Sequence, residues 1–154
     1  MPISGDDSSL IIKILKQLEL FKGLNEADHS EIIKRMTLEY FPKNHVIFRE
    51  GDFGDCFYAI KRGMVRIFHE AAGQKPAEDI AILSDGDFFG EMAMIEDNPR
   101  NSTAQTIEES EVFKLNKKDF IALVSSDPNM SSRISSEFLT RLKSNIHREK
   151  EANS

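Results

Sequence analysis

Residues 86–103 read GDFFGEMAMIEDNPRNST, and the interpretation of the whole chain starts from this segment. The residues between Gly90 and Pro99 predict a short helix, from Glu91 to about Ile95, placed inside a block of strands. The first N–H groups of a helix have no partner within the helix, and Gly90 lets a ligand approach the backbone closely. The segment therefore predicts an anion site at which a phosphate group is stabilised.

Two charged side chains of this segment narrow the chemistry of the ligand. Arg100 offers a guanidinium group that can bind a phosphate through two parallel hydrogen bonds. The carboxylate of Glu91 would repel a phosphate unless it accepts a hydrogen bond, and a sugar hydroxyl is a suitable donor. The pair indicates a ligand that carries both a phosphate and a free hydroxyl.

Outside this segment, strand-like patterns occupy residues 44–116. Short runs rich in Val, Ile, Phe and Tyr alternate with glycine-bearing turns, which is typical of an antiparallel sandwich or barrel. The runs are residues 45–49, 56–61, 64–69, 78–83, 102–107 and 111–115.

Helical patterns lie on both sides of the strand block. On the amino-terminal side, Ser8-Ser9 predicts the N-cap of a first helix that ends near Gly23. Asn25 predicts the cap of a second helix that continues through Met36.

On the carboxyl-terminal side, Asn116 predicts the cap of a short helix that continues through Val124. Pro128 then opens a long last helix that runs to about Lys150.

Composition excludes several classes of function. Lys and Arg number 20 and Asp and Glu number 26, so the net charge of −6 argues against nucleic acid as the main partner. One cysteine, Cys56, allows neither an internal disulfide nor a four-cysteine metal site. The four histidines are scattered, and no phosphate-cradling or nucleophile-elbow motif is present, so we expect neither a metal site nor an enzyme. An acidic amino terminus and the lack of a long apolar stretch predict a cytoplasmic protein with no membrane partner.

The motifs at residues 89–94 (FGEMAM) and 99–103 (PRNST) resemble the phosphate-binding cassette of the cyclic nucleotide-binding domain family. The usual pattern of that cassette is Phe-Gly-Glu, two small or apolar residues, and then Pro-Arg-x-Ala followed by Thr or Ser. Residues 50–52 (EGD) and 55–58 (DCFY) also resemble earlier turns of the family. From about residue 20 to residue 150 the order of elements fits the family, and within it resembles most the bacterial regulators of the catabolite-activator type.

The resemblance implies a mainly β fold with flanking α-helices, namely a double-stranded β-helix, or jelly roll. Residues 1–43 would form an amino-terminal helical segment, and residues 44–116 the jelly roll, with the cassette and its short phosphate-binding helix at 89–103. Residues 117–154 would form the carboxyl-terminal helices, of which the long last one acts as a lid. The whole chain would be a single cyclic nucleotide-binding domain.

The resemblance also assigns roles to the cassette residues of this chain. Glu91 would accept a hydrogen bond from the ribose 2′-hydroxyl, and Arg100 would pair with the exocyclic oxygens of the cyclic phosphate. Phe89 is the aromatic residue with which the Phe-Gly-Glu motif of the cassette begins. Backbone contacts would come from Gly90, Met92, Ala93 and Asn101.

Five further residues carry an alternative interpretation each. Ser102 stands where the family has alanine, so its hydroxyl either binds phosphate or is tolerated as a small side chain; we expect the second. Asn145 would contact the adenine amino group, unless it is an ordinary exposed asparagine. Ile67, Ile80 and Leu83 would line the wall of the pocket, unless they are plain core residues.

These assignments predict a sensor of cyclic nucleotides that needs no cofactor other than its ligand. We expect cAMP rather than cGMP, because guanosine-selective members often carry Thr directly after the cassette arginine, where this chain has Asn101. Closure of the last helix would pass the signal to a downstream protein that the sequence does not identify. The apolar face of that helix predicts a homodimer, with packing on the barrel as the alternative. This face consists of Ile134, Phe138, Leu142 and Ile146.

Two other functions compete with the sensor. The chain could be a degenerate jelly roll that serves as an interaction module without a ligand, although Glu91 and Arg100 argue against this. It could also be a fragment of a larger cAMP-dependent transcription regulator. Because the chain ends at Ser154, where such regulators add a DNA-binding domain, we expect no direct contact with nucleic acid.

Overall fold

Two antiparallel sheets form the body of the protein in a computed structural model, which describes residues 3–134. One sheet has the strand order β1-β8-β3-β6 and the other the order β2-β7-β4-β5. The strands are β1 (Thr37–Phe41), β2 (Val46–Phe48), β3 (Cys56–Arg62), β4 (Met64–His69), β5 (Glu78–Ser84), β6 (Phe88–Phe89), β7 (Thr103–Thr106) and β8 (Ser110–Asn116). The predicted mainly β jelly roll is confirmed.

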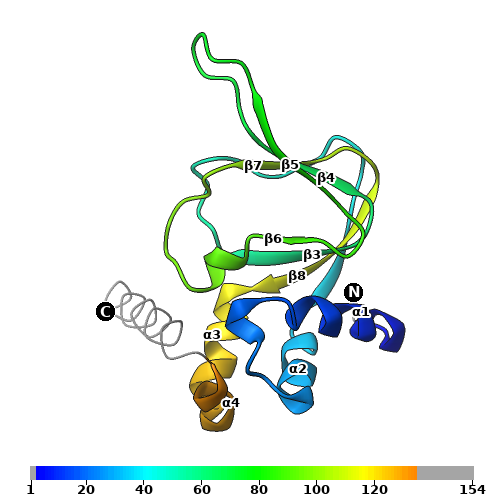
Figure 1. The fold of residues 1–154 in the computed structure, drawn as a ribbon, viewed down its shortest axis with the longest axis vertical. Coiled ribbons are helices and arrows are strands. Elements are labelled where there is room, and N and C mark those ends of the chain that lie inside the picture. The colour runs from blue at the N-terminus through cyan, green and yellow to red at the C-terminus, as the bar shows by residue number, and fades with distance from the viewer. Residues whose placement is uncertain (1–2, 135–154) are drawn as a thin grey trace.

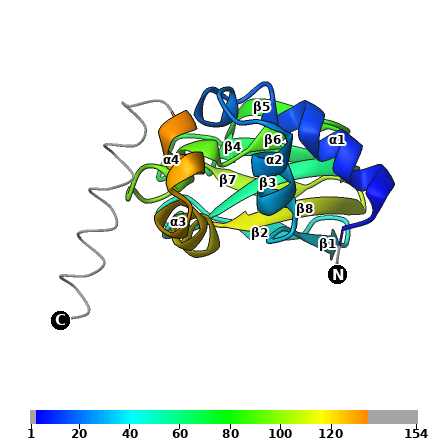
Figure 2. The same ribbon diagram turned by 90° about the horizontal axis from the view of Figure 1, so that it is seen from below.

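The helices gather on the outer face of the sheet that contains β3 and β8 (Figure 1). Seen from below, α1 and α2 cross this sheet and α3 lies beside them (Figure 2). The helical elements are α1 (Gly5–Leu15), the 3-10 helix η1 (Glu19–Phe21), α2 (Glu26–Ile33), the 3-10 helix η2 (Glu91–Met94), α3 (Lys117–Ser126) and α4 (Pro128–Arg133).

Strand β3 separates two hydrophobic cores. Residues Cys56 to Ile60 are all buried, because successive side chains of a strand point to opposite faces and both faces of this strand are covered. Phe57 and Ala59 face the helices, whereas Cys56, Tyr58 and Ile60 face the opposite sheet. Each core therefore rests on one face of the same strand.

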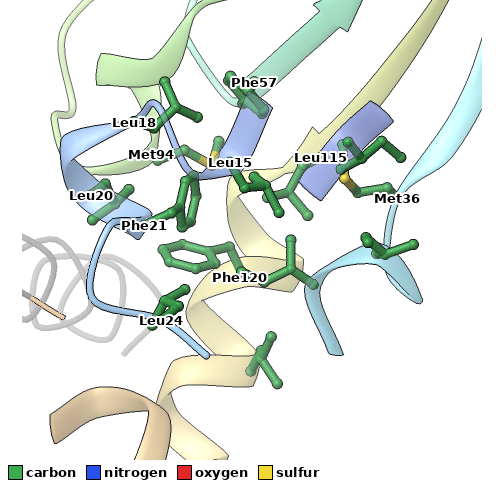
Figure 3. Packing of buried hydrophobic residues seen from close by; sticks show 14 of the residues in the cluster. Leu15, Leu18, Leu20, Phe21, Leu24, Met36, Phe57, Met94, Leu115 and Phe120 are labelled. Carbon is green, nitrogen blue, oxygen red and sulfur yellow. The ribbon is translucent and has the colours of Figure 1, made fainter. Parts of the chain in front are cut away.

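The core under the helices joins distant parts of the chain around η2. Met94 of η2 lies among side chains from η1, α3 and β3, including Leu20, Phe21, Phe57 and Phe120 (Figure 3). The rings of Phe21 and Phe120 meet edge to face with centroids 5.3 Å apart. The short helix of the predicted cassette is thus anchored from behind by a buried apolar residue.

Local capping signals gave mixed results in the amino-terminal helices. Asn25 caps α2 as expected, and the Asp28 carboxylate accepts a hydrogen bond from the Asn25 backbone N–H, which makes a capping box. The predicted cap at Ser8-Ser9 is wrong: the hydroxyl of Ser4 accepts from the Asp7 amide and caps α1, which ends at Leu15. Strand β1 was not anticipated, and the sheet begins at Thr37 within the segment predicted to be helical.

The last helix begins at Pro128 as expected but is interrupted at Ile134, and the rest of its expected range, to about Lys150, lies outside the described residues. Helix α4 ends at Arg133, and Ile134 takes up an extended conformation with its side chain buried in the core under the helices. The Arg133 guanidinium binds Asp28 of α2 through two bonds of 2.6 Å. Burial of Ile134 and this ion pair fix the chain to the rest of the fold at the point where α4 ends.

The remaining predictions on the carboxyl-terminal segment fall on residues 135–154. Asn145 and the dimer face of Phe138, Leu142 and Ile146 lie outside the described residues. Within residues 3–134, no helix is long and apolar enough to cross a bilayer.

Candidate functional site

A cavity of about 450 Å³ lies where η2, the segment that leads into β7 and the loop before β3 meet. Its volume falls in the range usual for small-molecule sites, roughly 300 to 1,000 Å³. The lining residues are Phe48, Gly54, Ile67, Phe88, Phe89, Gly90, Glu91, Met92, Ala93, Glu96, Asn98, Pro99, Arg100, Asn101 and Ser102.

Gly90 is required where the chain turns from β6 into η2. Its φ of 79° lies in the left-handed region, which side chains other than glycine rarely adopt. A Cβ at this position would lie 2.9 Å from both the Arg100 Nη1 atom and the Cys56 carbonyl oxygen. The absence of a side chain thus leaves room for the guanidinium group.

The Arg100 guanidinium is held in place before any ligand binds. Its Nη2 donates to the Cys56 carbonyl at 2.8 Å, and its Cζ lies 4.1 Å from the centroid of the Phe48 ring. The Arg100 backbone is bonded on both sides, because its N–H donates to the Asp52 carbonyl at 2.7 Å and its carbonyl accepts from Gly51 at 2.8 Å. The side chain therefore needs little reorganisation to bind an anion.

One donor of this guanidinium is buried without use. The Arg100 Nε atom has no hydrogen-bond partner among residues 3–134, and the side chain forms no ion pair within that range. Desolvation lowers the pKa of Arg100, and the neighbouring Tyr58, Cys56 and acidic groups partly oppose this effect. Arginine remains charged at neutral pH, so this partly buried cation on the cavity wall has no counter-ion in the part of the chain that the structure describes. An anionic ligand would satisfy it.

Glu91 stands at the first position of η2, on the wall of the same cavity. Burial raises the pKa of its carboxyl group, the Leu20 amide lowers it, and Glu19 raises it further. A partly desolvated carboxylate gains from a hydrogen-bond donor on a ligand.

The backbone of η2 has one of its predicted donors already in use. The Ala93 amide donates to the Gly90 carbonyl at 3.2 Å and closes the first turn. The amides of Glu91 and Met92 come before this bond and have no acceptor within the helix. These two amides, rather than that of Ala93, are the backbone groups that the turn leaves for an anion.

The family described as "Cyclic nucleotide-binding domain" matches this chain over residues 38–127. The chain belongs to the cyclic nucleotide-binding domain family. This confirms the resemblance seen in the cassette, and the family is a regulatory binding domain that also occurs within larger proteins, kinases among them.

Relatives of this cyclic nucleotide-binding domain include eukaryotic and bacterial proteins. The "cGMP-dependent protein kinase egl-4" of Caenorhabditis briggsae is 37% identical over 119 residues, which cover 75% of this chain and 16% of the kinase. The "Cyclic AMP receptor protein" of Thermus thermophilus is 27% identical over 129 residues, covering 84% of this chain and 59% of that protein. This chain thus spans less than two thirds of the length of these relatives.

A solved structure supports the fold independently. The structure described as "cAMP bound PfPKA-R (141-441)" superposes with a TM-score of 0.72 at 24% identity, over 86% of this chain and 45% of that one. At this identity the likeness shows the fold.

The structure brings most of the predicted site residues of this domain together. Nine of them line the cavity: Ile67, Phe89, Gly90, Glu91, Met92, Ala93, Arg100, Asn101 and Ser102. Ser102 is buried, and its hydroxyl donates to the Asn101 side chain at 3.3 Å. Their roles toward a ligand remain predictions.

Two predicted wall residues do not reach the lining of the cavity. Ile80 lies on β5 with 52% of its surface exposed. Leu83 packs against the core between the two sheets, in line with the alternative that it is a plain core residue. Strand β5 pairs with β4 through a shifted register beside Ile67, and this irregularity could not be foreseen from the alternation of residues.

Sequence reasoning missed three groups that shape the site around Arg100. Phe48 contributes its ring, Cys56 its backbone carbonyl, and Gly54 the space for the guanidinium, because a Cβ on Gly54 would lie 3.3 Å from Arg100 Nε. Gly54 lies between residues 50–52 and 55–58, the two stretches that resemble turns of the family, and this was the one signal that pointed to its position.

Proposed function

We propose that this chain is a sensor that binds a cyclic nucleotide in the cavity beside η2, with cAMP preferred over cGMP. The observation that carries the proposal is the half-buried Arg100 side chain on the wall of the cavity, whose buried Nε has no hydrogen-bond partner among the described residues. In this proposal Arg100 binds the cyclic phosphate and Glu91 accepts from the ribose 2′-hydroxyl. The binding function involves no catalysis by this chain.

The base preference rests on Asn101, which stands directly after the arginine where guanosine-selective members often carry Thr. The names of relatives point to both nucleotides, since one kinase is called cGMP-dependent and the bacterial receptor is named for cyclic AMP. Binding of cGMP is therefore the competing candidate within the same site.

Signal output belongs to the same proposal. Residues 135–154 would close over the base, with Asn145 at the adenine amino group, and would pass the change to a second copy or a downstream protein. Binding can act as a switch only if the nucleotide makes different contacts in the open and closed states. The Asp28–Arg133 pair fixes the point from which such a movement would start.

Calorimetric titration with cAMP and with cGMP tests the proposal. We expect Arg100→Ala to weaken binding by about 2 to 5 kcal/mol, the range found when one partner of a buried charge pair is removed. Arg62→Ala is the matched control, because Arg62 is exposed, pairs with Glu111 and lies outside the cavity lining. Titrations of ligand-free wild-type protein that show no heat with either nucleotide would contradict the sensor and favour an interaction module. Tighter binding of cGMP would reverse the base preference alone.

A further inference from the structure

Lys117, the first residue of α3, is a lysine buried to 4% exposure next to the cavity. Its Nζ donates to the Glu96 carbonyl at 2.9 Å and lies 3.8 Å from the Asp97 carboxylate. Glu96 lines the cavity and follows η2 closely, and its own amide donates to the Met92 carbonyl at 2.9 Å. The Lys117 side chain therefore holds the end of the short helix whose first residue is Glu91.

The backbone of Lys117 reaches the other side of the same site. Its N–H donates to the Asp55 carbonyl at 2.8 Å. Asp55 immediately precedes Cys56, whose carbonyl accepts the hydrogen bond from Arg100 Nη2. One residue thus connects the segment that orients the phosphate-facing arginine with the helix that carries the hydroxyl-facing carboxylate.

Burial of an ammonium group calls for an explanation, because desolvation of a charge is unfavourable and an apolar side chain of similar length would pack without that cost. The hydrogen bond to the Glu96 carbonyl and the nearby Asp97 carboxylate supply one, since a buried charge is stabilised by polar partners. Groups that bind a ligand must be held within about 0.5 Å of the productive geometry by the residues behind them. The contacts of Lys117 meet that requirement on both sides of the cavity.

We infer that Lys117 is a positioning residue for nucleotide binding: it sets the spacing of Glu91 on η2 relative to the Arg100 guanidinium, without touching the ligand. The inference rests on the proposed function, and it assigns the specificity for the ribose hydroxyl to a lysine on a different element.

The test compares cAMP with 2′-deoxy-cAMP, which lacks the hydroxyl that Glu91 is proposed to bind. Lys117→Met removes the ammonium group at similar side-chain length, and Lys118→Met is the matched control, because Lys118 is the exposed neighbour on the same helix. For Lys117→Met we expect cAMP binding to weaken by about tenfold, in line with the loss of a hydrogen bond to a charged group. We also expect the dissociation constant of 2′-deoxy-cAMP divided by that of cAMP to fall toward one. Lys118→Met should leave both dissociation constants unchanged.

The ratio distinguishes positioning from general destabilisation, because a loosened fold that retains the site geometry weakens both nucleotides equally. Circular dichroism verifies that each variant is folded at the titration temperature. If Lys117→Met does not fold, Lys117→Gln, which is shorter but polar, must show the same fall in the ratio. Wild-type protein that binds neither nucleotide would overturn the proposed function. Wild-type binding with an unchanged ratio in the folded Lys117 variant would overturn only the role of Lys117.

Discussion

At the scale of single residues, the site depends on close approaches between backbone and side chain around Arg100. Gly90 and Gly54 leave the space, the Cys56 carbonyl accepts from the guanidinium, and Phe48 covers it with an aromatic face. Cation–π contacts of this kind contribute about 0.5 to 2 kcal/mol, so they orient the group more than they neutralise it. The buried Nε has no hydrogen-bond partner among the described residues.

Gly90→Ala tests whether this space is required. The left-handed φ costs about 1 to 3 kcal/mol for a residue with a Cβ, and the new methyl group would also meet Arg100 and the Cys56 carbonyl. We expect a lower free energy of unfolding together with loss of nucleotide binding, measured by denaturant titration and calorimetry.

Gly73→Ala is the control for Gly90→Ala. Gly73 also has a positive φ, 60°, but a Cβ there meets nothing within 4 Å. This variant should show the backbone cost alone and bind nucleotide normally. Equal losses of stability and intact binding in both variants would refute the steric argument.

At the scale of elements, α2 carries two buried polar residues with opposite environments. The Asp28 carboxylate accepts hydrogen bonds from the Arg133 guanidinium and from the backbone N–H of Asn25, and these bonds lower its pKa. The adjacent His29 is 2% exposed, and neither ring nitrogen has a partner among residues 3–134. Burial, followed by the charge of Lys16, lowers the pKa of His29, while Asp28 and Glu26 oppose this.

The His29 environment predicts a loss of stability in mild acid. Because the folded protein favours the neutral ring, the unfolded chain binds more protons as the pH falls below about 6.5, the ordinary pKa of histidine. The free energy of unfolding should therefore be highest above that pH and decrease as the pH falls through it toward the lower folded pKa. Urea unfolding between pH 8 and pH 5 is the measurement.

His29→Leu should flatten this profile, since it removes the titrating group. His45→Gln, at an exposed histidine, should retain the wild-type slope. A profile that remains equally steep in His29→Leu would show that other groups cause the acid sensitivity. The loss of the Asp28–Arg133 pair would follow only at lower pH, because a carboxyl with a lowered pKa contributes stability until it is protonated.

At the scale of the whole molecule, η2 belongs to the core that joins the helices to the sheet. Met94 shares this core with residues from α1, η1, α2, β3 and α3 (Figure 3). The short helix of the site and the helical layer are therefore packed into one hydrophobic core. A ligand bound at η2 should stabilise this layer together with the sheet rather than one loop.

Thermal unfolding with cAMP tests this shared core. A ligand that binds only the folded state adds about 2.7 kcal/mol of stability at a concentration 100 times its dissociation constant. We expect one cooperative transition whose midpoint rises with cAMP, both by far-UV circular dichroism and by tyrosine absorbance. Arg100→Ala should show a much smaller rise at the same concentration. Two separate transitions, of which only one responds to cAMP, would contradict a shared core.

The sequence by itself determined what depends on local patterns. Alternating runs predicted six of the strands, Asn25 predicted its helix cap, and the cassette motif predicted the family and most of the residues that line the cavity. These signals could be found because side-chain period, capping and motif spacing involve residues near each other in the chain.

Only the tertiary structure decided the contacts between distant segments. It paired β1 with β8, brought the Cys56 carbonyl and the Phe48 ring to Arg100, and ended α4 where Arg133 meets Asp28. Such contacts leave no local pattern: a backbone carbonyl is the same in every residue, and a buried ion pair depends on how helices pack. The cassette could thus be recognised from its own residues, whereas the groups that hold Arg100 and η2 in place became visible only once the chain was folded.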